Sequence, residues 1–483
     1  MTLPDPALVR LAEGVLLPGF TGTTVPGWLA RSIDRGLAGV CVFAPNVDAG
    51  FAELTRTLHG LRDGFVVASD EEGGTVTRLE QSTGSSWPSA AALGRLDDVA
   101  ATEAVAGGIG RMCRSAGIDL ALAPVADVNA EPDNPVIGIR SFGATPELVG
   151  RHTAAFVRGM QGAGVAASAK HFPGHGSTTV DSHRELPTVD ADATTLRERD
   201  IAPFAAAVEA GVRSVLTAHV RFPAIDGEAP ATMSPALLGI LREELGFDGV
   251  VISDALDMHA VARGVGRGPG GVAALAAGVD LLCTGNPSFP HPYDDEQGYH
   301  EVRDAVVAAL ADGTLSRDRV ADAGRRVAEM AAWVASRPHR EPPPGGAGLD
   351  AARRVLDVLG DVRIGRGAHV LDLTSGPGIA AGKHDTRLVT ALARLDAGVT
   401  SADVAEVADV DAALAVAAGR PVVAVVDGPR PTVEAVRAAR PDAVLVHIGL
   451  PDGRWLPSAP SVTVWGDGMV HAQAAAEALA RAW

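Results

Sequence analysis

The sequence predicts a (β/α)8 barrel of the TIM type, followed by a smaller three-layer α/β domain. Eight short apolar runs flanked by Gly or Pro alternate with Ala-rich segments whose apolar residues recur at three- and four-residue spacing. Strands that alternate with helices pair in parallel, and eight such units are typical of a closed barrel. An open, doubly wound sheet is the alternative fold. The predicted strands are 15–20, 39–44, 65–70, 120–127, 165–171, 214–220, 249–254 and 280–285.

A Pro/Gly-rich segment, PHREPPPGGAG at 338–348, predicts a linker between two domains. The barrel is expected to occupy 1–337. Residues 349–483 contain further apolar runs that alternate with helical segments, which indicates the smaller α/β domain. The stretch GDGMVH at 466–471 lacks the third glycine of a dinucleotide-binding loop, so no nucleotide or other cofactor is predicted.

Composition and charge restrict the partners of this chain. Its 483 residues carry a net charge of −18, from 41 basic and 59 acidic residues, and this charge disfavours nucleic acid and anionic membrane surfaces. The sequence shows no signal-peptide pattern and no membrane-spanning apolar run. The three cysteines have no CxxC spacing, so we expect reduced, buried thiols and a cytoplasmic protein. The sequence does not indicate an oligomeric state.

Polar side chains collect where the predicted strands end. In a (β/α)8 barrel these carboxyl ends form the face that holds the active site. An Asp after a strand is also a common turn or helix cap, but five of the eight predicted strands end in a carboxylate, an ammonium or an imidazole. These residues are Asp70, Asp127, Lys170 with His171, His219 and Asp254.

The connection after the fifth strand is long for a barrel loop. It begins with KHFPGHGSTTVDSH at 170–183, and a capping box at 195–198 predicts that the next helix starts near Thr194. Lys170 is one of two lysines in the chain. Long ordered loops on this face of a barrel usually carry function.

Three chemistries are compatible with this loop. His171 and His175 have the spacing of helical zinc ligands, but Pro173 and Gly174 interrupt a helix there, and we predict no metal. Residues 174–176 have a weak phosphate-cradle pattern. The third chemistry is proton transfer by the segment Asp181-Ser-His183.

Proton transfer is the chemistry that the spacing favours. In an extended segment, residues i and i+2 project to one side, so Asp181 is positioned to orient the imidazole of His183. Asp254 ends the seventh strand and is the candidate nucleophile. A nucleophilic carboxylate with a separate acid/base is the arrangement of a retaining glycosidase.

Five motifs together closely resemble glycoside hydrolase family 3, specifically its β-N-acetylglucosaminidase branch, which includes peptidoglycan-recycling enzymes. The resemblance covers 1–337 and implies the same barrel fold. At two positions where the family usually has Arg and Asp, this chain has Thr75 and Ser177. The motifs are DEEGGTVTR (70–78), NPVIGIRSFG (134–143), KHFPGHGSTTVDSH (170–183), TAHVRFPAID (217–226) and LGFDGVVISDALDM (245–258).

The resemblance implies a role for each matching residue. Asp254 corresponds to the catalytic nucleophile, His183 to the acid/base, and Asp181 to the residue that orients His183. His219 and Met258 lie in the same motifs and are additional candidates. The sugar-binding positions are matched by Asp70, Arg78, Arg140, Lys170 and His171.

The expected activity is release of terminal N-acetylglucosamine from short β-linked glycans or muropeptide-like cell-wall fragments, with retained configuration. An aromatic content of 4% disfavours a long polysaccharide cleft, which needs stacking platforms. A β-glucosidase or β-glucosaminide phosphorylase of the same family is one alternative. A non-catalytic sugar-binding protein is the alternative from another class.

Overall fold

The computed structural model describes residues 5–182, 185–288, 292–338, 346–375, 387–451 and 460–481. Contacts divide the chain into two compact units, each of which is described by itself. The first unit comprises Met1–Glu71, Thr102–Ile137 and Ala144–Pro343, and the second comprises Glu72–Ala101, Gly138–Gly143 and Pro344–Trp483.

The first unit is a TIM-type barrel of parallel strands. Strands β2-β3-β4-β5-β6-β9 lie side by side, β1 pairs with β10, a bridge between Ile252 and Leu281 joins β9 to β10, and β1 lies against β2. Each predicted strand overlaps one of these eight, and β5 ends one residue beyond its predicted range, so the strand predictions are confirmed for this described part of the chain. The strands are β1 (Leu16–Pro18), β2 (Gly39–Val42), β3 (Val66–Ser69), β4 (Leu120–Ala121), β5 (Ala166–Phe172), β6 (Ser214–Thr217), β9 (Val250–Ile252) and β10 (Leu282–Gly285).

The barrel strands are buried along their whole length, as expected when side chains fill the interior and helices cover the outside. Leu17, Leu120 and Ile252 share one apolar cluster with Met330 and Val334 of α13. The last helix of the unit therefore packs against side chains of several barrel strands. The three cysteines are free and buried, as predicted.

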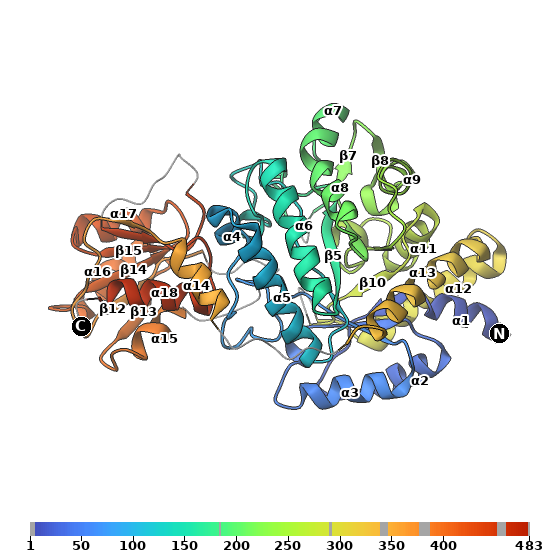
Figure 1. Cartoon of the computed structure of the whole chain (residues 1–483), viewed down its shortest axis with the longest axis horizontal. Helices are drawn as coiled ribbons and strands as arrows, with labels where there is room; N and C mark the ends of the chain where they lie inside the picture. Colours follow the sequence, from blue (N-terminus) through green and yellow to red (C-terminus); the bar gives the residue numbers. More distant parts are fainter. Residues whose placement is uncertain are drawn as a thin grey trace. The chain divides into compact units, whose positions relative to one another are not determined.

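Helices surround these strands, and α6 and α8 pack against each other and against β5 (Figure 1). None of the helices in the described part of the chain is long and apolar enough to cross a membrane. The helices are α1 (Pro6–Glu13), α2 (Gly27–Arg35), α3 (Phe51–Leu61), α5 (Val99–Ser115), α6 (Pro146–Gly162), α7 (Ala193–Thr195), α8 (Ala202–Glu209), α9 (Pro235–Gly239), α10 (His259–Ala262), α11 (Arg267–Ala277), α12 (Asp295–Asp312) and α13 (Arg317–Ala335).

Two local features of the barrel differ from the sequence predictions. The predicted capping box at Thr195 is wrong, because Asp192 caps α7 by accepting the backbone N–H groups of Thr194 and Thr195. An Asp side chain accepts backbone N–H groups of the first turn as well as a Thr side chain does, and both Asp192 and Thr195 lie near the helix start. The structure also has an unpredicted antiparallel hairpin of β7 (Arg221–Phe222) and β8 (Asp226–Pro230).

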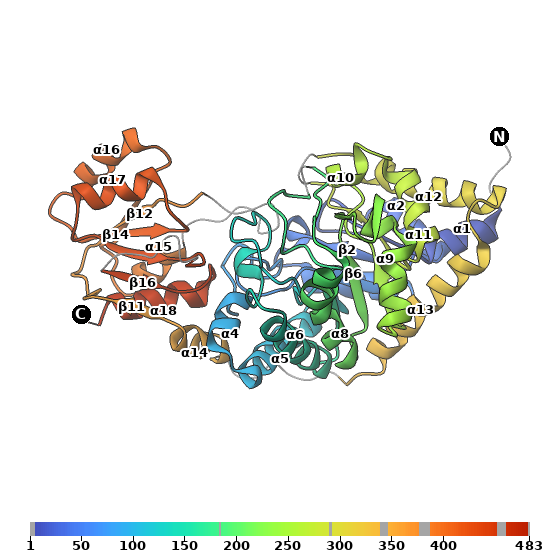
Figure 2. The ribbon, with the colours of Figure 1, turned by 90° about the horizontal axis from the view of Figure 1, so that it is seen from above.

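The second unit contains a six-stranded sheet, in the order β11-β16-β15-β14-β12-β13, in which only the edge strand β11 is antiparallel. Along β14, Val423 and Val425 join one apolar cluster and Ala424 and Val426 join another. Helices α15 and α18 supply the first cluster, and α16 and α17 the second, so the sheet is covered on both faces (Figure 2). This is the predicted three-layer α/β architecture.

The elements of the second unit begin with a helix from the connection after β3, α4 (Ala90–Leu96). The remaining helices are α14 (Ala347–Arg354), α15 (Arg387–Ala393), α16 (Val410–Val416), α17 (Pro431–Ala439) and α18 (Met469–Leu479). The strands are β11 (Asp357–Leu359), β12 (His369–Asp372), β13 (Thr400–Asp403), β14 (Val422–Val426), β15 (Val444–His447) and β16 (Ser461–Thr463).

Residues 72–101 fold with the C-terminal residues rather than with the strands that flank them in the sequence. The hydroxyl of Ser89 donates to the carbonyl of Trp465 at 2.6 Å, and the backbone N–H of Ser89 donates to Nε2 of His471 at 3.0 Å. The domain boundaries at 337 and 349 stay predictions, and residues 339–345 of the proposed linker lie outside the described residues.

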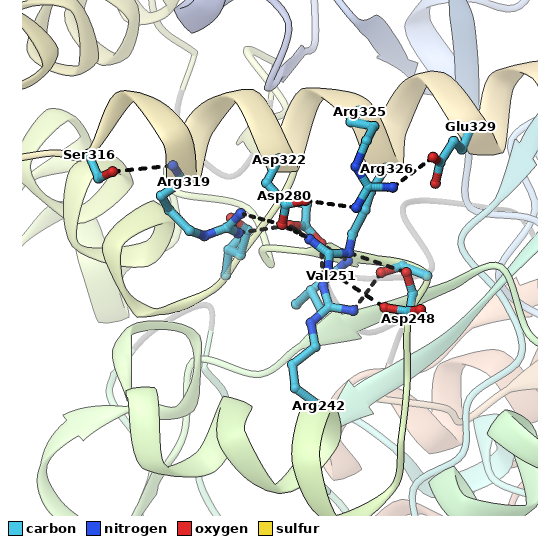
Figure 3. A network of polar contacts seen from close by, with 12 residues as sticks. Arg242, Asp248, Val251, Asp280, Ser316, Arg319, Asp322, Arg325, Arg326 and Glu329 are labelled. Atoms are coloured by element: carbon cyan, nitrogen blue, oxygen red, sulfur yellow. Dashed lines mark hydrogen bonds and ion pairs between the residues drawn. The ribbon is translucent and has the colours of Figure 1, made fainter.

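A buried carboxylate at the N-terminal side of β10 holds α13 to the barrel (Figure 3). The side chain of Asp280 is fully buried and pairs with Arg242 and with Arg319 of α13, the latter at 2.7 Å. Asp280 Oδ2 also accepts the backbone N–H of Val251 in β9 at 2.9 Å. One anion thus connects two strands and two helical segments.

We expect Asp280→Asn to lower the free energy of unfolding by about 3 kcal/mol, because removing one partner of a buried ion pair leaves uncompensated buried charge. Urea denaturation measures this loss as a lower midpoint. The control is Glu329→Gln, which breaks a pair with Arg325 whose side chains are 52% and 61% exposed. That control is expected to change stability by less than about 1 kcal/mol. Equal effects of the two substitutions would contradict the role of Asp280.

Candidate active site

Two predicted sugar-binding residues form an ion pair at the carboxyl ends of barrel strands. Lys170 lies in β5, and Asp70 directly follows β3. Lys170 Nζ lies 2.8 Å from Asp70 Oδ1, and the lysine side chain is only 3% exposed. Because the ammonium has three hydrogens, it can hold Asp70 and also donate to a ligand. The pairing explains why a buried lysine is tolerated here.

His171 follows Lys170 in β5 and pairs with the buried carboxylate of Asp127. His171 Nδ1 lies 2.7 Å from Asp127 Oδ2, and its backbone N–H donates to Asp127 Oδ1 at 3.2 Å. Asp127 is fully buried. A carboxylate acceptor at Nδ1 requires a hydrogen on Nδ1, so Nε2 is the acceptor in the corresponding neutral tautomer.

The loop that follows is fastened to the segment after β4 by its backbone. The N–H of His175 donates to Asp127 Oδ1 at 2.7 Å, and the carbonyl of His175 accepts from Asn134 Nδ2 at 2.8 Å. At Gly176 a Cβ would lie 1.9 Å from the carbonyl oxygen of Val128, so only glycine permits this approach. Because Asp127 uses the N–H of His175, the phosphate-cradle interpretation of 174–176 loses a donor that it needs.

The side chain of His175 is buried and bonded at both ring nitrogens. Nδ1 lies 3.0 Å from the hydroxyl of Thr178, and Nε2 lies 2.9 Å from the hydroxyl of Ser182. Burial, with a smaller contribution from His171, lowers the pKa of His175 to about 4, although Asp127 and Asp254 oppose the shift. His175 is therefore a neutral imidazole at neutral pH, with its nitrogens committed to two hydroxyls.

The candidate nucleophile Asp254 is half-buried and follows β9 by two residues. Its Oδ1 accepts the N–H of Ala255 at 2.8 Å. The carbonyl of Ala255 accepts from His219 Nε2 at 3.1 Å, and Thr232 Oγ1 lies 2.9 Å from Nδ1 of that ring. His219, predicted as an additional site residue, is fully buried and supports the segment that carries Asp254.

The other predicted site residues of the first unit are only partly described. Asp181 is half-buried, and His183 lies outside the described residues. Met258 is buried and precedes α10.

Arg78 and Arg140 belong to the second unit. Arg140 makes a two-pronged ion pair with Glu72, with Nε to Oε2 at 2.9 Å and Nη2 to Oε1 at 2.8 Å. Both side chains are less than 10% exposed, so the plane of the guanidinium is fixed. Arg78 is half-buried. Glu72 was not singled out from the sequence, although its place beside Asp70 in DEEGG was the available signal.

Three further residues of the site were not assigned from the sequence. From the sequence, Asp127 stands out only as a strand end, His175 has no assigned role, and Ser182 carries no signal beyond its place between Asp181 and His183. Their importance comes from contacts with residues far away in the sequence, which spacing alone does not reveal.

A barrel with carboxylates, a buried lysine and imidazoles at the carboxyl ends of its strands is the architecture of a barrel enzyme whose site lies on that face. The model of the glycosyl hydrolase family 3 N terminal domain matches residues 52–330. The chain belongs to this family.

Curated relatives and solved structures agree with this assignment. A β-hexosaminidase A of Pseudoalteromonas piscicida is 34% identical over an alignment of 334 residues that covers 64% of this chain and 55% of that protein. The chain therefore spans about half the length of this relative. A β-hexosaminidase of Hydrogenovibrio crunogenus is 35% identical over 56% of this chain and 79% of its own length. A family 3 β-N-acetylglucosaminidase structure from Paenibacillus sp. has a TM-score of 0.86 and 29% identity, and the match covers 99% of this chain and 96% of that one.

The buried, neutral His175 predicts a pH dependence of stability. Its pKa is about 4 in the folded protein, against an ordinary value of 6.5. Between these values the unfolded chain binds more protons, so stability rises with pH, and the contribution is lost as pH falls from about 6.5 to about 4. The full effect is about 3 kcal/mol. His175→Gln removes this titration.

The measurement is the difference in unfolding free energy between the natural protein and His175→Gln at a series of pH values. The difference cancels the other titrating groups, including His471, whose pKa burial also lowers to about 4. We expect the natural protein to lose free energy of unfolding relative to His175→Gln as pH falls. A difference that stays constant from pH 7 to pH 4 would contradict the titration of His175.

Proposed function

We propose that this protein is a retaining, exo-acting β-N-acetylglucosaminidase that releases terminal N-acetylglucosamine from short β-linked glycans or muropeptide-like cell-wall fragments. The observation that carries the proposal is the half-buried carboxylate of Asp254 at the end of β9. The parallel strands place it on the same barrel face as the Lys170–Asp70 pair. Relatives named β-hexosaminidase or β-N-acetylglucosaminidase support the choice of sugar.

In the first step, an oxygen of Asp254 attacks the anomeric carbon, and the bond from that carbon to the leaving oxygen breaks. His183, oriented by Asp181, donates a proton to that oxygen, so the leaving group departs as a neutral alcohol. The product is a glycosyl ester of Asp254. An imidazole acid/base also avoids placing a second anion beside the nucleophile.

In the second step, His183 takes a proton from water, whose oxygen attacks the anomeric carbon. The ester bond to Asp254 breaks and the carboxylate is regenerated. Two inversions at one carbon give a product of retained configuration.

The other predicted site residues serve recognition. In the barrel, Lys170 donates to sugar oxygens and the carboxylate of Asp70 accepts from sugar hydroxyls. Arg78 and Arg140, the other predicted sugar-binding residues, have the chemistry to donate to hydroxyl or acetamido oxygens. His171 is held by Asp127 with Nε2 as its acceptor, which suits a sugar hydroxyl as donor.

We expect p-nitrophenol to be released much faster from the β-N-acetylglucosaminide than from the β-glucoside, because a site built for the acetamido group leaves polar groups unpaired when that group is missing. The assay is run with and without inorganic phosphate, and the sugar product is identified. Free N-acetylglucosamine in both arms supports hydrolysis. A sugar 1-phosphate would replace hydrolysis by phosphorolysis, and binding of N-acetylglucosamine without turnover would support a sugar-binding protein.

The two catalytic roles differ in their dependence on the leaving group. Asp254→Ala is expected to lower kcat by roughly 10⁴-fold or more on every substrate, because no covalent intermediate forms. His183→Ala is expected to lose roughly 10²–10⁴-fold on diacetylchitobiose, whose leaving oxygen needs a proton, and far less on a dinitrophenyl glycoside. Equal losses of His183→Ala on both substrates would contradict its role as the general acid.

A further inference from the structure

In the described part of the chain, a side-chain contact holds the loop after β5 near its far end. Nε2 of His175 lies 2.9 Å from Oγ of Ser182, and both residues are almost completely buried, at 1% and 2% exposure. Ser182 lies between Asp181 and His183 in the sequence. Because Ser182 is joined to each of these residues by one peptide bond, a contact that fixes Ser182 also restricts where its two neighbours can lie.

We propose that His175 is a positioning residue, whose imidazole holds Ser182 and so fixes the backbone that carries Asp181 and the proposed acid/base. This inference rests on the proposed function, because it concerns the placement of the general acid. His175 acts through Ser182 and is not proposed to contact the reacting atoms.

The hydrogen bonds around His175 define the direction of the contact. The hydroxyl of Thr178 lies 3.3 Å from the carbonyl oxygens of both His175 and Val180, so it has carbonyl acceptors for its one hydrogen. It then accepts from Nδ1–H of His175, which leaves Nε2 as the acceptor. Ser182 donates its hydroxyl to this nitrogen. A protonated ring would have lost that acceptor.

His175 is itself held from the neighbouring strand. Asp127 accepts its N–H and Asn134 donates to its carbonyl, so both backbone groups are fixed by residues that follow β4. Asp127 also holds His171, whose ring centre lies 6.0 Å from that of His175. The carboxylate of Asp127 thus orients a proposed sugar-binding residue, and through His175 and Ser182 it helps to position the proposed acid/base segment.

Among titratable groups, His171, Asp127 and Asp254 have the largest electrostatic effect on His175. Burial keeps His175 neutral above a pKa of about 4. The acceptor for Ser182 is therefore present throughout the pH range in which an imidazole acid/base works.

The test compares substitutions that imitate different nitrogens of the His175 ring. In His175→Asn, the shorter amide reaches toward Thr178 only. In His175→Gln, the longer amide places an oxygen near the former Nε2 and keeps an acceptor for Ser182. Ser182→Ala removes the donor. Each variant is assayed on diacetylchitobiose and on the dinitrophenyl N-acetylglucosaminide, and its folding is checked by circular dichroism and the thermal midpoint.

We expect His175→Asn and Ser182→Ala to lower kcat/KM on diacetylchitobiose by about 10–100-fold, because a displaced general acid loses alignment. The dinitrophenyl glycoside is expected to change by only a few fold. His175→Gln is expected to recover most of the activity. The double variant His175→Asn with Ser182→Ala is expected to be no worse than either single variant, since both break one contact.

Two controls separate positioning from loss of structure. Ser177→Ala removes a hydrogen bond to Asp200 in the same loop, at 3.0 Å, without touching Ser182. His152→Gln disturbs a buried imidazole that bonds the hydroxyl of Thr102 at 2.8 Å, away from the loop. Both are expected to affect the two substrates equally.

Equal losses on the two substrates for His175→Asn and Ser182→Ala, or additive losses in the double variant, would overturn the inference. If His175→Asn does not fold, Ser182→Ala decides the matter alone. If the natural protein does not cleave either substrate, or His183→Ala shows no dependence on the leaving group, the proposed function fails instead. Dependence in His183→Ala without dependence in the His175 and Ser182 variants rejects the positioning role only.

Discussion

The buried carboxylate of Asp127 is the constraint on which the candidate site depends. It accepts two backbone N–H groups and one imidazole from the segment that begins with His171 and includes His175. A buried carboxylate is unfavourable unless such donors surround it. The same donors are thereby fixed in place, so satisfying one anion also fastens the start of a long loop to the end of the neighbouring strand.

Two buried aspartates have different roles at the two ends of the barrel. Asp280 lies at the N-terminal side of β10 and joins strands to helices through Arg242 and Arg319. Asp127 lies on the carboxyl side, where it organises imidazoles. The difference follows from the fold, since the N-terminal face of a (β/α)8 barrel serves stability and the opposite face serves chemistry.

Much of this architecture could be predicted from local sequence pattern. The eight barrel strands appear in the sequence as short apolar runs because their side chains are buried on both faces of the sheet. The helix starts close to the predicted position, but the predicted capping residue Thr195 was wrong because Asp192 offers the same acceptor three residues earlier. The placement of residues 72–101 with the C-terminal residues was not predictable, since it rests on contacts such as that of Ser89 with His471 across the length of the chain.

The sequence by itself determined the family, the barrel and the candidate nucleophile, because periodicity and short motifs are properties of neighbouring residues. Only the tertiary structure decided the partners of these residues. Lys170 is committed to Asp70, Arg140 to Glu72, and His175 to Ser182. Each pair forms because burial removes water as an alternative partner, and burial depends on elements that fold together from distant parts of the chain.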